Sequence, residues 1–312
     1  MAQFLFVLKS ARPRQWLKNL ALFAALIFSG QLLSFDSFMP VVYAFFIFSL
    51  LTSSVYLFND VVDAPVDRRH PYKRYRPIAS GKLPISFALF LSVVGFFVSL
   101  ALARQLSFFF FLFCFAYLFL HVLYSLWVKR IPILDLLAIA TGFIIRVYAG
   151  AVVVNAHMNV WFLFTVISLS LFLAVGKRQS ERTLLVGRGE ILGGHRATLV
   201  GYSQRLLDVY TSMFANTTWI TYALFTFLYP QPVITRPRLV GFFAELPHTL
   251  VTQKWLMITV PIVVYGVMRY LQLIYERNEG ESPDKILVSD RPLLSAVLLW
   301  GVMVITIIYG IG

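Results

Sequence analysis

Three carboxylates followed by a run of cations stand between two apolar stretches, in the segment from Asn59 to Lys82. The carboxylates belong to Asp60, Asp63 and Asp67, which with Asn59 fall at helical intervals. Hard divalent cations take oxygen ligands, and Mg2+ usually binds one or two carboxylates together with the phosphates of a substrate. The pattern predicts that these four residues hold Mg2+, with the three aspartates as the catalytic residues.

The cations of this segment include Lys73, Arg74 and Arg76. Arg binds phosphate oxygens as a planar fork and Lys as a point charge, so these residues are expected to bind a phosphorylated substrate. The alternative is a solvated cytoplasmic loop that carries the ordinary excess of positive charge. The Asn-Asp-x-x-Asp core at the end of an apolar span favours the functional interpretation.

Pro65 interrupts the helical spacing of the carboxylates. Proline disfavours helix at the preceding residue and lacks a backbone donor. We therefore expect a helix that ends near Asp63, followed by a turn that brings Asp67 back to the site.

The composition is that of an all-α polytopic membrane protein. Of the 312 residues 59% are hydrophobic and 13% are charged, and the mean hydropathy is +0.77, whereas soluble domains carry about 25% charged residues. The single cysteine excludes an intrachain disulfide and a cysteine-based metal site.

Nine apolar runs predict nine transmembrane helices, after an interfacial lead-in at 1–15. The runs are 16–34, 38–58, 84–103, 107–128, 132–154, 158–176, 209–230, 255–274 and 292–310.

The connections between these runs alternate in charge. With the N-terminus in the cytoplasm, 22 of the 27 Lys and Arg lie on the inner side, as the positive-inside rule requires. This places the protein in the inner membrane with its C-terminus outside, and makes 59–83 and 177–208 cytoplasmic active-site loops of one domain, 1–312. Because topology explains the net charge of +13, no nucleic-acid partner is expected; the oligomeric state is left open.

Two more cationic groups lie at the ends of predicted spans. Lys129 and Arg130 close a Tyr- and Trp-containing stretch, which is either an interface anchor or a set of ligands. Lys177, Arg178 and Glu181 follow the sixth span, where they are either simple loop charge or ligands of a second phosphate.

Arg146 lies deep within a predicted span, eleven residues after Asp135. An arginine at that depth needs a partner or a water-filled cavity. Either it forms a structural pair with a carboxylate, or it binds a phosphate group inside the cavity.

These motifs together resemble the UbiA superfamily of intramembrane prenyltransferases. Within it, they are most similar to the branch of decaprenyl-phosphate phosphoribosyltransferases. The matching segments are Arg12-Pro13-Arg14-Gln15-Trp16-Leu17-Lys18-Asn19, the run from Asn59 to Gly81, Gly142-Phe143 with Arg146 and Ala149-Gly150, Gly176-Lys177-Arg178, and Ser289-Asp290-Arg291.

The resemblance implies a UbiA-like helical bundle with a central cavity open to the cytosol and laterally to the bilayer. It implies transfer of a 5-phosphoribosyl group from phosphoribosyl diphosphate to a polyprenyl phosphate, in the synthesis of cell-wall arabinan precursors. Membrane lipids surround such an enzyme. The implied substrate-binding residues are Lys18, Asn19, Asn59, Lys73, Arg74, Arg76, Lys129, Arg130, Arg146, Lys177, Arg178 and Glu181.

One departure from the broader superfamily bears on the substrate. Aromatic prenyltransferases carry a second aspartate motif after the sixth span, where this chain has Lys177, Arg178 and Glu181. One acidic motif with several cations suits a donor and an acceptor that both bear phosphate. The alternatives are an aromatic polyprenyltransferase of quinone biosynthesis and a transporter for an anionic metabolite. Transport is disfavoured because the charges gather at one face and the two halves of the chain do not match.

Overall fold

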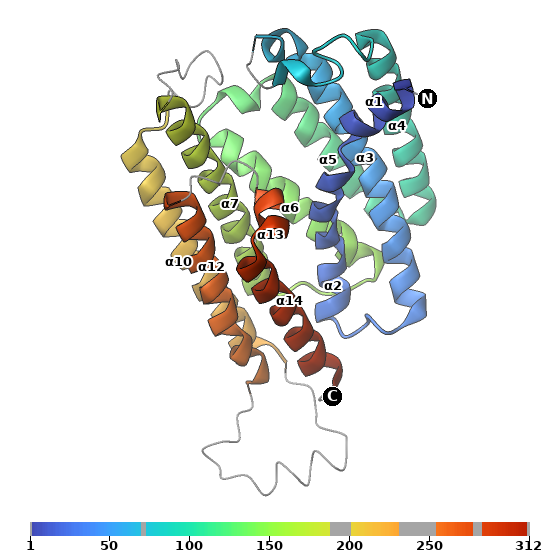
Figure 1. Cartoon of the computed structure of the whole chain (residues 1–312). Coiled ribbons are helices and arrows are strands. Elements are labelled where there is room, and N and C mark those ends of the chain that lie inside the picture. Colours follow the sequence, from blue (N-terminus) through green and yellow to red (C-terminus); the bar gives the residue numbers. More distant parts are fainter. Residues whose placement is uncertain (1, 70–72, 188–200, 231–253, 277–282, 311–312) are drawn as a thin grey trace, which may run out of the picture. The chain divides into compact units, whose positions relative to one another are not determined.

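The computed structural model describes residues 2–69, 73–187, 201–230, 254–276 and 283–310. Its regular elements are all helical (Figure 1). They run in the order α1 (Ala2–Ala11), η1 (Pro13–Leu22), α2 (Phe23–Phe28), α3 (Phe35–Asp67), η2 (Lys73–Tyr75), α4 (Ile85–Leu106), α5 (Phe108–Leu126), η3 (Val128–Arg130), α6 (Leu134–Val153), α7 (Val160–Gly187), α10 (Gln204–Leu228), η4 (Trp255–Thr259), α12 (Val260–Tyr275), α13 (Pro283–Ser289), α14 (Arg291–Ile305) and η5 (Thr306–Gly310).

Seven helical segments among the described residues are long and apolar enough to cross a membrane. Each coincides with one of the nine apolar runs, and the two runs left over are 16–34 and 209–230. The first of these is divided between η1 and α2, and the second is the helix α10. The all-helical membrane architecture is therefore confirmed, whereas the number nine stays a prediction.

The chain forms two compact units. The first contains Met1–His157 with Leu185–Ser203, and the second contains Met158–Leu184 with Gln204–Gly312. The single domain expected from the sequence stays a prediction.

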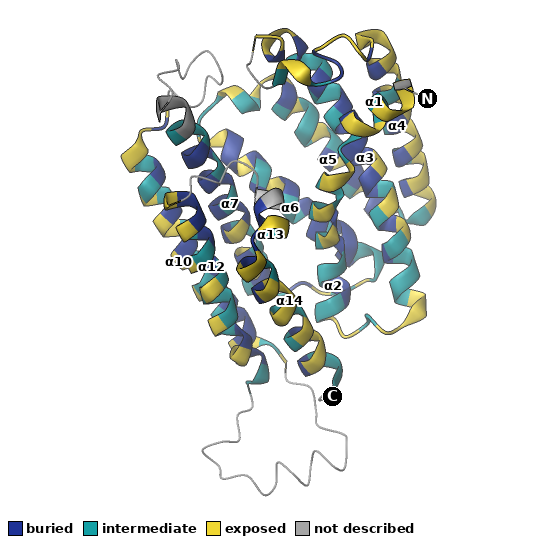
Figure 2. Cartoon of the chain, in the orientation of Figure 1, coloured by how far each residue is buried: buried dark blue, intermediate teal, exposed yellow. Residues whose placement is uncertain are grey.

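In the first unit α3 and α6 are the central helices. More than half of the most apolar stretch of each is buried, 56% in both, compared with 17% for α4 and 22% for α5. Exposed residues, in yellow, are visible along α4 (Figure 2). Phe48 and Leu51 of α3 pack with Tyr117 of α5 and Ile145 of α6 in the main core.

Small residues let these helices approach closely. A Cβ atom built on Gly150 of α6 would lie 1.9 Å from the backbone oxygen of Leu22 at the end of η1, and one on Gly95 of α4 would lie 2.0 Å from Ser54 Oγ of α3. In the second unit, Gly176 of α7 likewise packs against Ile274 of α12. These contacts are the close helix packing that small residues permit in membranes.

The helix α3 corrects one expectation. It does not end near Asp63 but continues through Pro65 to Asp67. Pro65 cannot donate to the carbonyl four residues earlier, so α3 continues at the cost of that one backbone hydrogen bond. The Arg68 amide closes the helix by donating a hydrogen bond to the Ala64 carbonyl at 3.1 Å.

Candidate functional site

The carboxylates lie along one face of the last two turns of α3. Asp60 and Asp67 are buried, and Asp63 is half-buried. Because the helix is uninterrupted, positions 60, 63 and 67 follow the i, i+3, i+7 spacing that places side chains on one face. Asn59 lies beside them and donates from Nδ2 to Asp63 Oδ2 at 2.9 Å.

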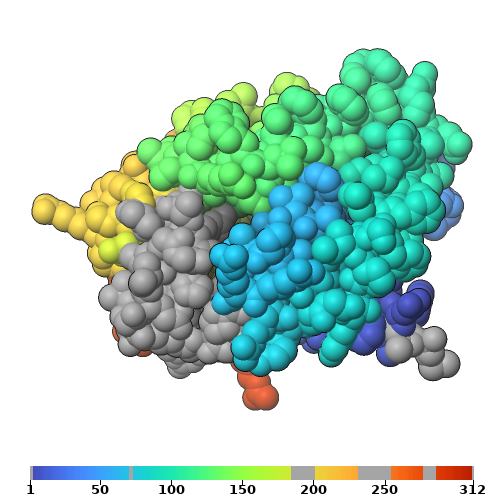
Figure 3. Space-filling view, turned by 90° about the horizontal axis from the view of Figure 1, so that it is seen from above, coloured from blue at the N-terminus to red at the C-terminus, as the bar shows by residue number. Residues whose placement is uncertain are grey.

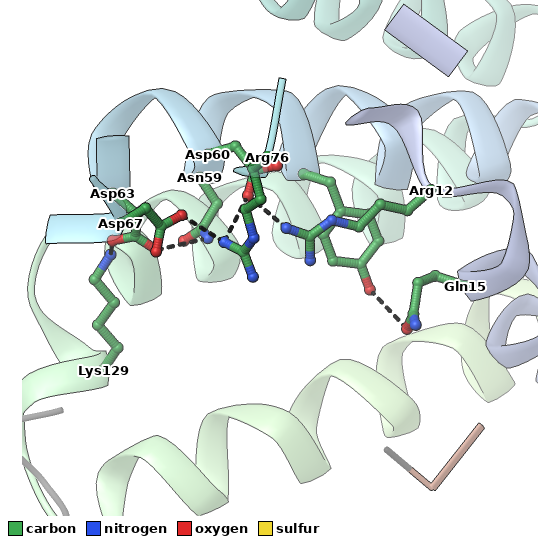
Figure 4. Close-up of polar contacts among 9 residues, drawn as sticks. Arg12, Gln15, Asn59, Asp60, Asp63, Asp67, Arg76 and Lys129 are labelled. Carbon is green, nitrogen blue, oxygen red and sulfur yellow. Dashed lines mark hydrogen bonds and ion pairs between the residues drawn. The ribbon is translucent and has the colours of Figure 1, made fainter. Parts of the chain in front are cut away.

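Each carboxylate is bonded to a cation (Figure 4). Arg76 Nη1 donates to Asp67 Oδ2 at 2.6 Å and to Asp60 Oδ1 at 3.2 Å. Lys129 Nζ lies 2.5 Å from Asp63 Oδ1, and Arg12 Nη2 lies 2.5 Å from Asp60 Oδ1. The three carboxylates and the three cations therefore balance in formal charge.

The loop after α3 is built to hold Arg76 over the helix. Its backbone folds into successive turns, in which Ser80 N donates to Arg76 O at 2.8 Å and Leu83 N donates to Pro77 O at 2.9 Å. Ile78 and Leu83 bury their side chains against Ala64 and other apolar residues of α3 and α4. Apolar burial thus fixes the loop, and the loop fixes the guanidinium.

Three other predicted cations of this region are Lys73, Arg74 and Arg130. Arg74 is exposed, and its guanidinium donates to the Tyr75 hydroxyl at 2.7 Å. Lys73 is half-buried at the start of η2, and Arg130 is exposed at the end of η3. Residues 70–72, which include His70 of the motif, lie outside the described part of the chain. In the space-filling view the light-blue and cyan residues of this region border the green residues that follow α5 (Figure 3).

Arg12 lies in the site but was not among the substrate-binding residues predicted from the sequence. It stood in the matched segment 12–19, but its partner is 48 residues away along the chain. Its guanidinium lies 5.0 Å from the centre of the Tyr56 ring. In the sequence, Arg12 is recognisable only as a basic residue directly before a proline. No local pattern indicates that it contacts Asp60.

A ladder of hydrogen bonds fastens η1 along α3 in antiparallel register. Trp16 Nε1 donates to Ser53 Oγ at 2.9 Å, and Asn19 Nδ2 donates to Ser49 Oγ at 3.0 Å and to Thr52 Oγ1 at 3.2 Å. A 3-10 helix has three residues per turn, so Trp16, Asn19 and Leu22 share one face. This explains why a ten-residue segment takes that conformation here. Lys18, another predicted ligand, is half-buried on the same segment.

Arg146 lies in a separate, buried cluster. It is 4% exposed and donates to Asn19 Oδ1 at 2.9 Å, to the Gly142 carbonyl at 2.9 Å and to the Tyr117 hydroxyl at 2.7 Å. Its guanidinium also lies over the rings of Tyr117, at 4.8 Å, and Phe143, at 5.2 Å. No carboxylate pairs with it among the described residues, so one of the two alternatives, a structural pair with a carboxylate, is not seen there. Neutral acceptors and aromatic rings contact the guanidinium instead.

Asp135, the carboxylate on the same helix as Arg146, accepts a hydrogen bond from the Tyr202 hydroxyl at 2.7 Å. The amide of Ile133 is bonded to that hydroxyl at 2.6 Å. Asp135 therefore helps to stabilise the start of α6 through the Tyr202 hydroxyl.

The third predicted cluster belongs to the second unit and is helical. Because α7 runs on to Gly187, positions 177–187 are not a loop; residues 188–200 lie outside the described part of the chain. Arg178 is 1% exposed and bonds Glu181 Oε2 at 2.9 Å from Nη1, whereas Lys177 is more exposed and lies 4.0 Å from Glu181. Their role toward phosphate stays a prediction.

The donor set fits Mg2+ in its chemistry: three carboxylates and one amide side chain supply hard oxygen ligands. Asp60 and Asp67 both reach the same nitrogen of Arg76, so their oxygens converge on one point that a small cation can share. Within the described residues, no three Asp, Glu, His or Cys are grouped closely enough to hold a metal ion in this arrangement. Binding a metal at these oxygens would require the carboxylates to release the basic side chains that are bonded to them.

Comparison with known proteins agrees with this architecture. The model of the UbiA prenyltransferase family matches residues 20–183. The chain belongs to the UbiA prenyltransferase family. It is similar to the decaprenyl-phosphate phosphoribosyltransferase of Mycolicibacterium smegmatis, with 32% identity over 94% of this chain and 89% of that protein. It is also similar to the proteins of the same name from Mycobacterium tuberculosis, at 31% identity over 94% and 91%, and from Corynebacterium glutamicum, at 29% over 97% and 86%.

Solved structures support the same fold. A UbiA homolog from Archaeoglobus fulgidus bound to GPP and Mg2+ matches with a TM-score of 0.68 and 18% identity, over 97% of this chain and 99% of that one. The same homolog bound to DMAPP and Mg2+ matches with a TM-score of 0.69 and 18% identity, over 97% and 98%. With its seven candidate spans, this UbiA protein is an integral membrane protein.

Proposed function

We propose that this protein transfers the 5-phosphoribosyl group from phosphoribosyl diphosphate to a polyprenyl phosphate and releases diphosphate. Two observations support the proposal together. Relatives named decaprenyl-phosphate phosphoribosyltransferase match over 94% or more of the chain, and the end of α3 carries three carboxylates and three cations in contact. The carboxylate–cation cluster is the observation that carries the proposal, because it suits a metal together with phosphate groups.

Asp60, Asp63 and Asp67, with Asn59, would hold Mg2+ on the diphosphate of the donor. Bound there, the metal stabilises the negative charge that grows on the leaving group. Side chains of the protein would bind the phosphate groups. Arg76, with Lys73 and Arg74 of the same loop, would bind the phosphates of the donor, and Lys129 would do so from η3.

The reaction joins an oxygen of the acceptor phosphate to the anomeric carbon of the ribose as the bond to diphosphate breaks. That oxygen is already anionic, so no general base is required. The protein contributes positioning and a fixed array of charges. Lys177 and Arg178 remain candidate ligands of the other phosphate groups, as do Lys18 and Arg130.

The membrane arrangement belongs to the proposal. We place the end of α3 and the residues after Lys177 on the cytoplasmic side of the inner membrane, with the N-terminus inside. Nine crossings, with η1 and α2 as the first and α10 as the seventh, then leave the C-terminus outside. Single-cysteine labelling of Ser80→Cys in intact cells checks this: an impermeant reagent should leave it unlabelled, and labelling from outside contradicts the orientation.

Membranes that contain the protein test the activity. With Mg2+ they should transfer radiolabelled ribose phosphate from phosphoribosyl diphosphate to a polyprenyl phosphate, and chelation should stop the transfer. The competing activity is prenylation of a hydroxybenzoate or naphthoate from a polyprenyl diphosphate. That product, without labelled ribosyl lipid under the same conditions, overturns the substrate assignment and leaves the family intact.

A further inference from the structure

Arg12 lies at the junction between two helices of different character. On one side α1 exposes apolar side chains, with Phe4 65% and Leu5 60% exposed, as in helices that lie in a membrane interface. On the other side η1 runs along the apolar part of α3. Arg12 itself has a left-handed backbone, with φ 52° and ψ 60°, which non-glycine residues seldom adopt.

The ladder of η1 determines where the Arg12 side chain lies. Trp16 and Asn19 are fastened to Ser53, Ser49 and Thr52 by neutral hydrogen bonds. These bonds do not involve the carboxylate cluster. The segment that carries Arg12 therefore keeps its place when the partners of Asp60 change.

Asp60 carries one negative charge but forms ion pairs with two arginines. Its Oδ1 accepts from Arg12 at 2.5 Å and from Arg76 at 3.2 Å. If a divalent cation takes this carboxylate, both guanidinium groups lose an anionic partner. The cluster, which is neutral without the metal, then has an excess of positive charge that anionic phosphates can balance.

The three cations approach the carboxylates from different directions (Figure 4). Lys129 binds Asp63 and Arg76 binds Asp67, toward the end of α3. Arg12 instead lies over Tyr56, one helical turn back toward the apolar part of the span. A water-soluble donor reaches the cluster past the end of α3, whereas a lipid-linked phosphate reaches it from the membrane.

We infer that Arg12 binds the phosphate group of the polyprenyl phosphate acceptor once Asp60 has taken the metal. The inference rests on the proposed function and adds to it the residue that recognises the lipid substrate. Arg12 keeps 27% of its side chain exposed, so it can be reached without unfolding. The planar fork of a guanidinium suits two phosphate oxygens at once.

The experiment compares Arg12→Ala and Arg12→Lys with wild type in detergent. Arg14→Ala is the matched control, because Arg14 is exposed and lies two residues along the same segment. Two readouts are taken: the KM for each substrate, and the rise in Tm caused by decaprenyl phosphate in the presence of Mg2+ and without any donor. Decaprenol, which has the tail but no phosphate, is the ligand control.

Arg12→Ala should raise the KM for decaprenyl phosphate at least about tenfold, with a smaller rise for Arg12→Lys. The KM for phosphoribosyl diphosphate should change less than about twofold, a margin small beside the tenfold expected of a lost phosphate contact. The Tm rise with decaprenyl phosphate should disappear in Arg12→Ala and persist in Arg14→Ala.

An unchanged KM for decaprenyl phosphate, or an equal rise for both substrates, overturns the inference. So does a Tm rise that survives in both Arg12 variants, or one that decaprenol reproduces. The Tm readout needs no turnover. A wild-type protein that binds decaprenyl phosphate through Arg12 and transfers no ribosyl group therefore contradicts the proposed function alone.

Discussion

Arg76 and Arg146 are two arginines of the first unit whose surroundings differ in kind. Arg76 is 28% exposed and donates to two carboxylates. Arg146 is 4% exposed and donates to an amide, a carbonyl and a hydroxyl. In the proposed function, the first arginine would exchange its carboxylates for a phosphate when a metal binds. The second holds η1, α5 and α6 together and has no anion to exchange.

This comparison separates residues that recognise ligands from residues that support them. Moving a partly exposed guanidinium from a carboxylate to a phosphate costs little free energy, because the phosphate replaces the carboxylate as its anionic partner. A buried guanidinium bonded to neutral groups loses those bonds when it moves, and the groups are left unsatisfied. The predictions below test this separation, beginning with the largest expected effect.

Asp60→Asn should lower turnover by more than about 100-fold, because loss of an outer partner of a metal ligand already costs 10–100-fold. The amide keeps the size of the side chain but removes its charge. Transfer assays at limiting Mg2+ measure the effect, with the Tm as a control for folding. Near-normal activity in Asp60→Asn, Asp63→Asn and Asp67→Asn would place the metal site elsewhere.

Arg146→Ala should destabilise the protein by about 2–4 kcal/mol, because it leaves buried polar groups without partners and opens a cavity. Thermal unfolding in detergent measures the loss, and Mg2+ with phosphoribosyl diphosphate should not restore it. If Arg146→Ala keeps the wild-type Tm and raises the KM of one phosphate substrate, Arg146 is a phosphate ligand and the comparison fails.

Arg76→Ala should behave in the opposite way. It leaves Asp67 without its guanidinium and so lowers the Tm, but saturating Mg2+ should recover most of that loss by supplying a replacement cation. Turnover should stay at least about tenfold low, since a desolvated phosphate partner is missing. A Tm loss that Mg2+ does not recover would show that Arg76 is as structural as Arg146.

Gly150→Ala and Gly142→Ala form a pair on α6 with a smaller expected effect. A Cβ at Gly150 would meet the backbone of Leu22 at 1.9 Å, whereas one at Gly142 would meet His121 Nε2 at 3.2 Å. Backbone cannot yield as a side chain can, so Gly150→Ala should cost about 1–3 kcal/mol and Gly142→Ala less. Equal Tm values for the two variants would contradict the close contact of α6 with η1.

The sequence predicted the carboxylates and most of the spans because both depend on local pattern. Asp60, Asp63 and Asp67 stand at helical spacing, and apolar runs of sufficient length become helices in a membrane. The effect of Pro65 was predicted wrongly. A proline removes one backbone hydrogen bond but does not force a helix to end, and α3 continues through Pro65 to Asp67.

The contacts across the fold could not be predicted in the same way. Arg12 reaches Asp60 only because the chain turns at Arg12 and η1 then runs back along α3. That path depends on Trp16 and Asn19 finding Ser49, Thr52 and Ser53, which are distant in sequence. Similarly, Arg146 and Asp135 share a helix but do not pair with each other. Arg146 donates to Asn19, and Asp135 accepts from Tyr202.

The most direct measurement is a structure of the protein with phosphoribosyl diphosphate and Mg2+. The account predicts a metal ion on the carboxylates of Asp60, Asp63 and Asp67, with the diphosphate bound to it and the ribose 5-phosphate beside the cluster. Arg76 and Lys129 should then contact phosphate oxygens. The same carboxylates still paired with Arg76 and Lys129, and the ligand bound elsewhere, would contradict the central claim.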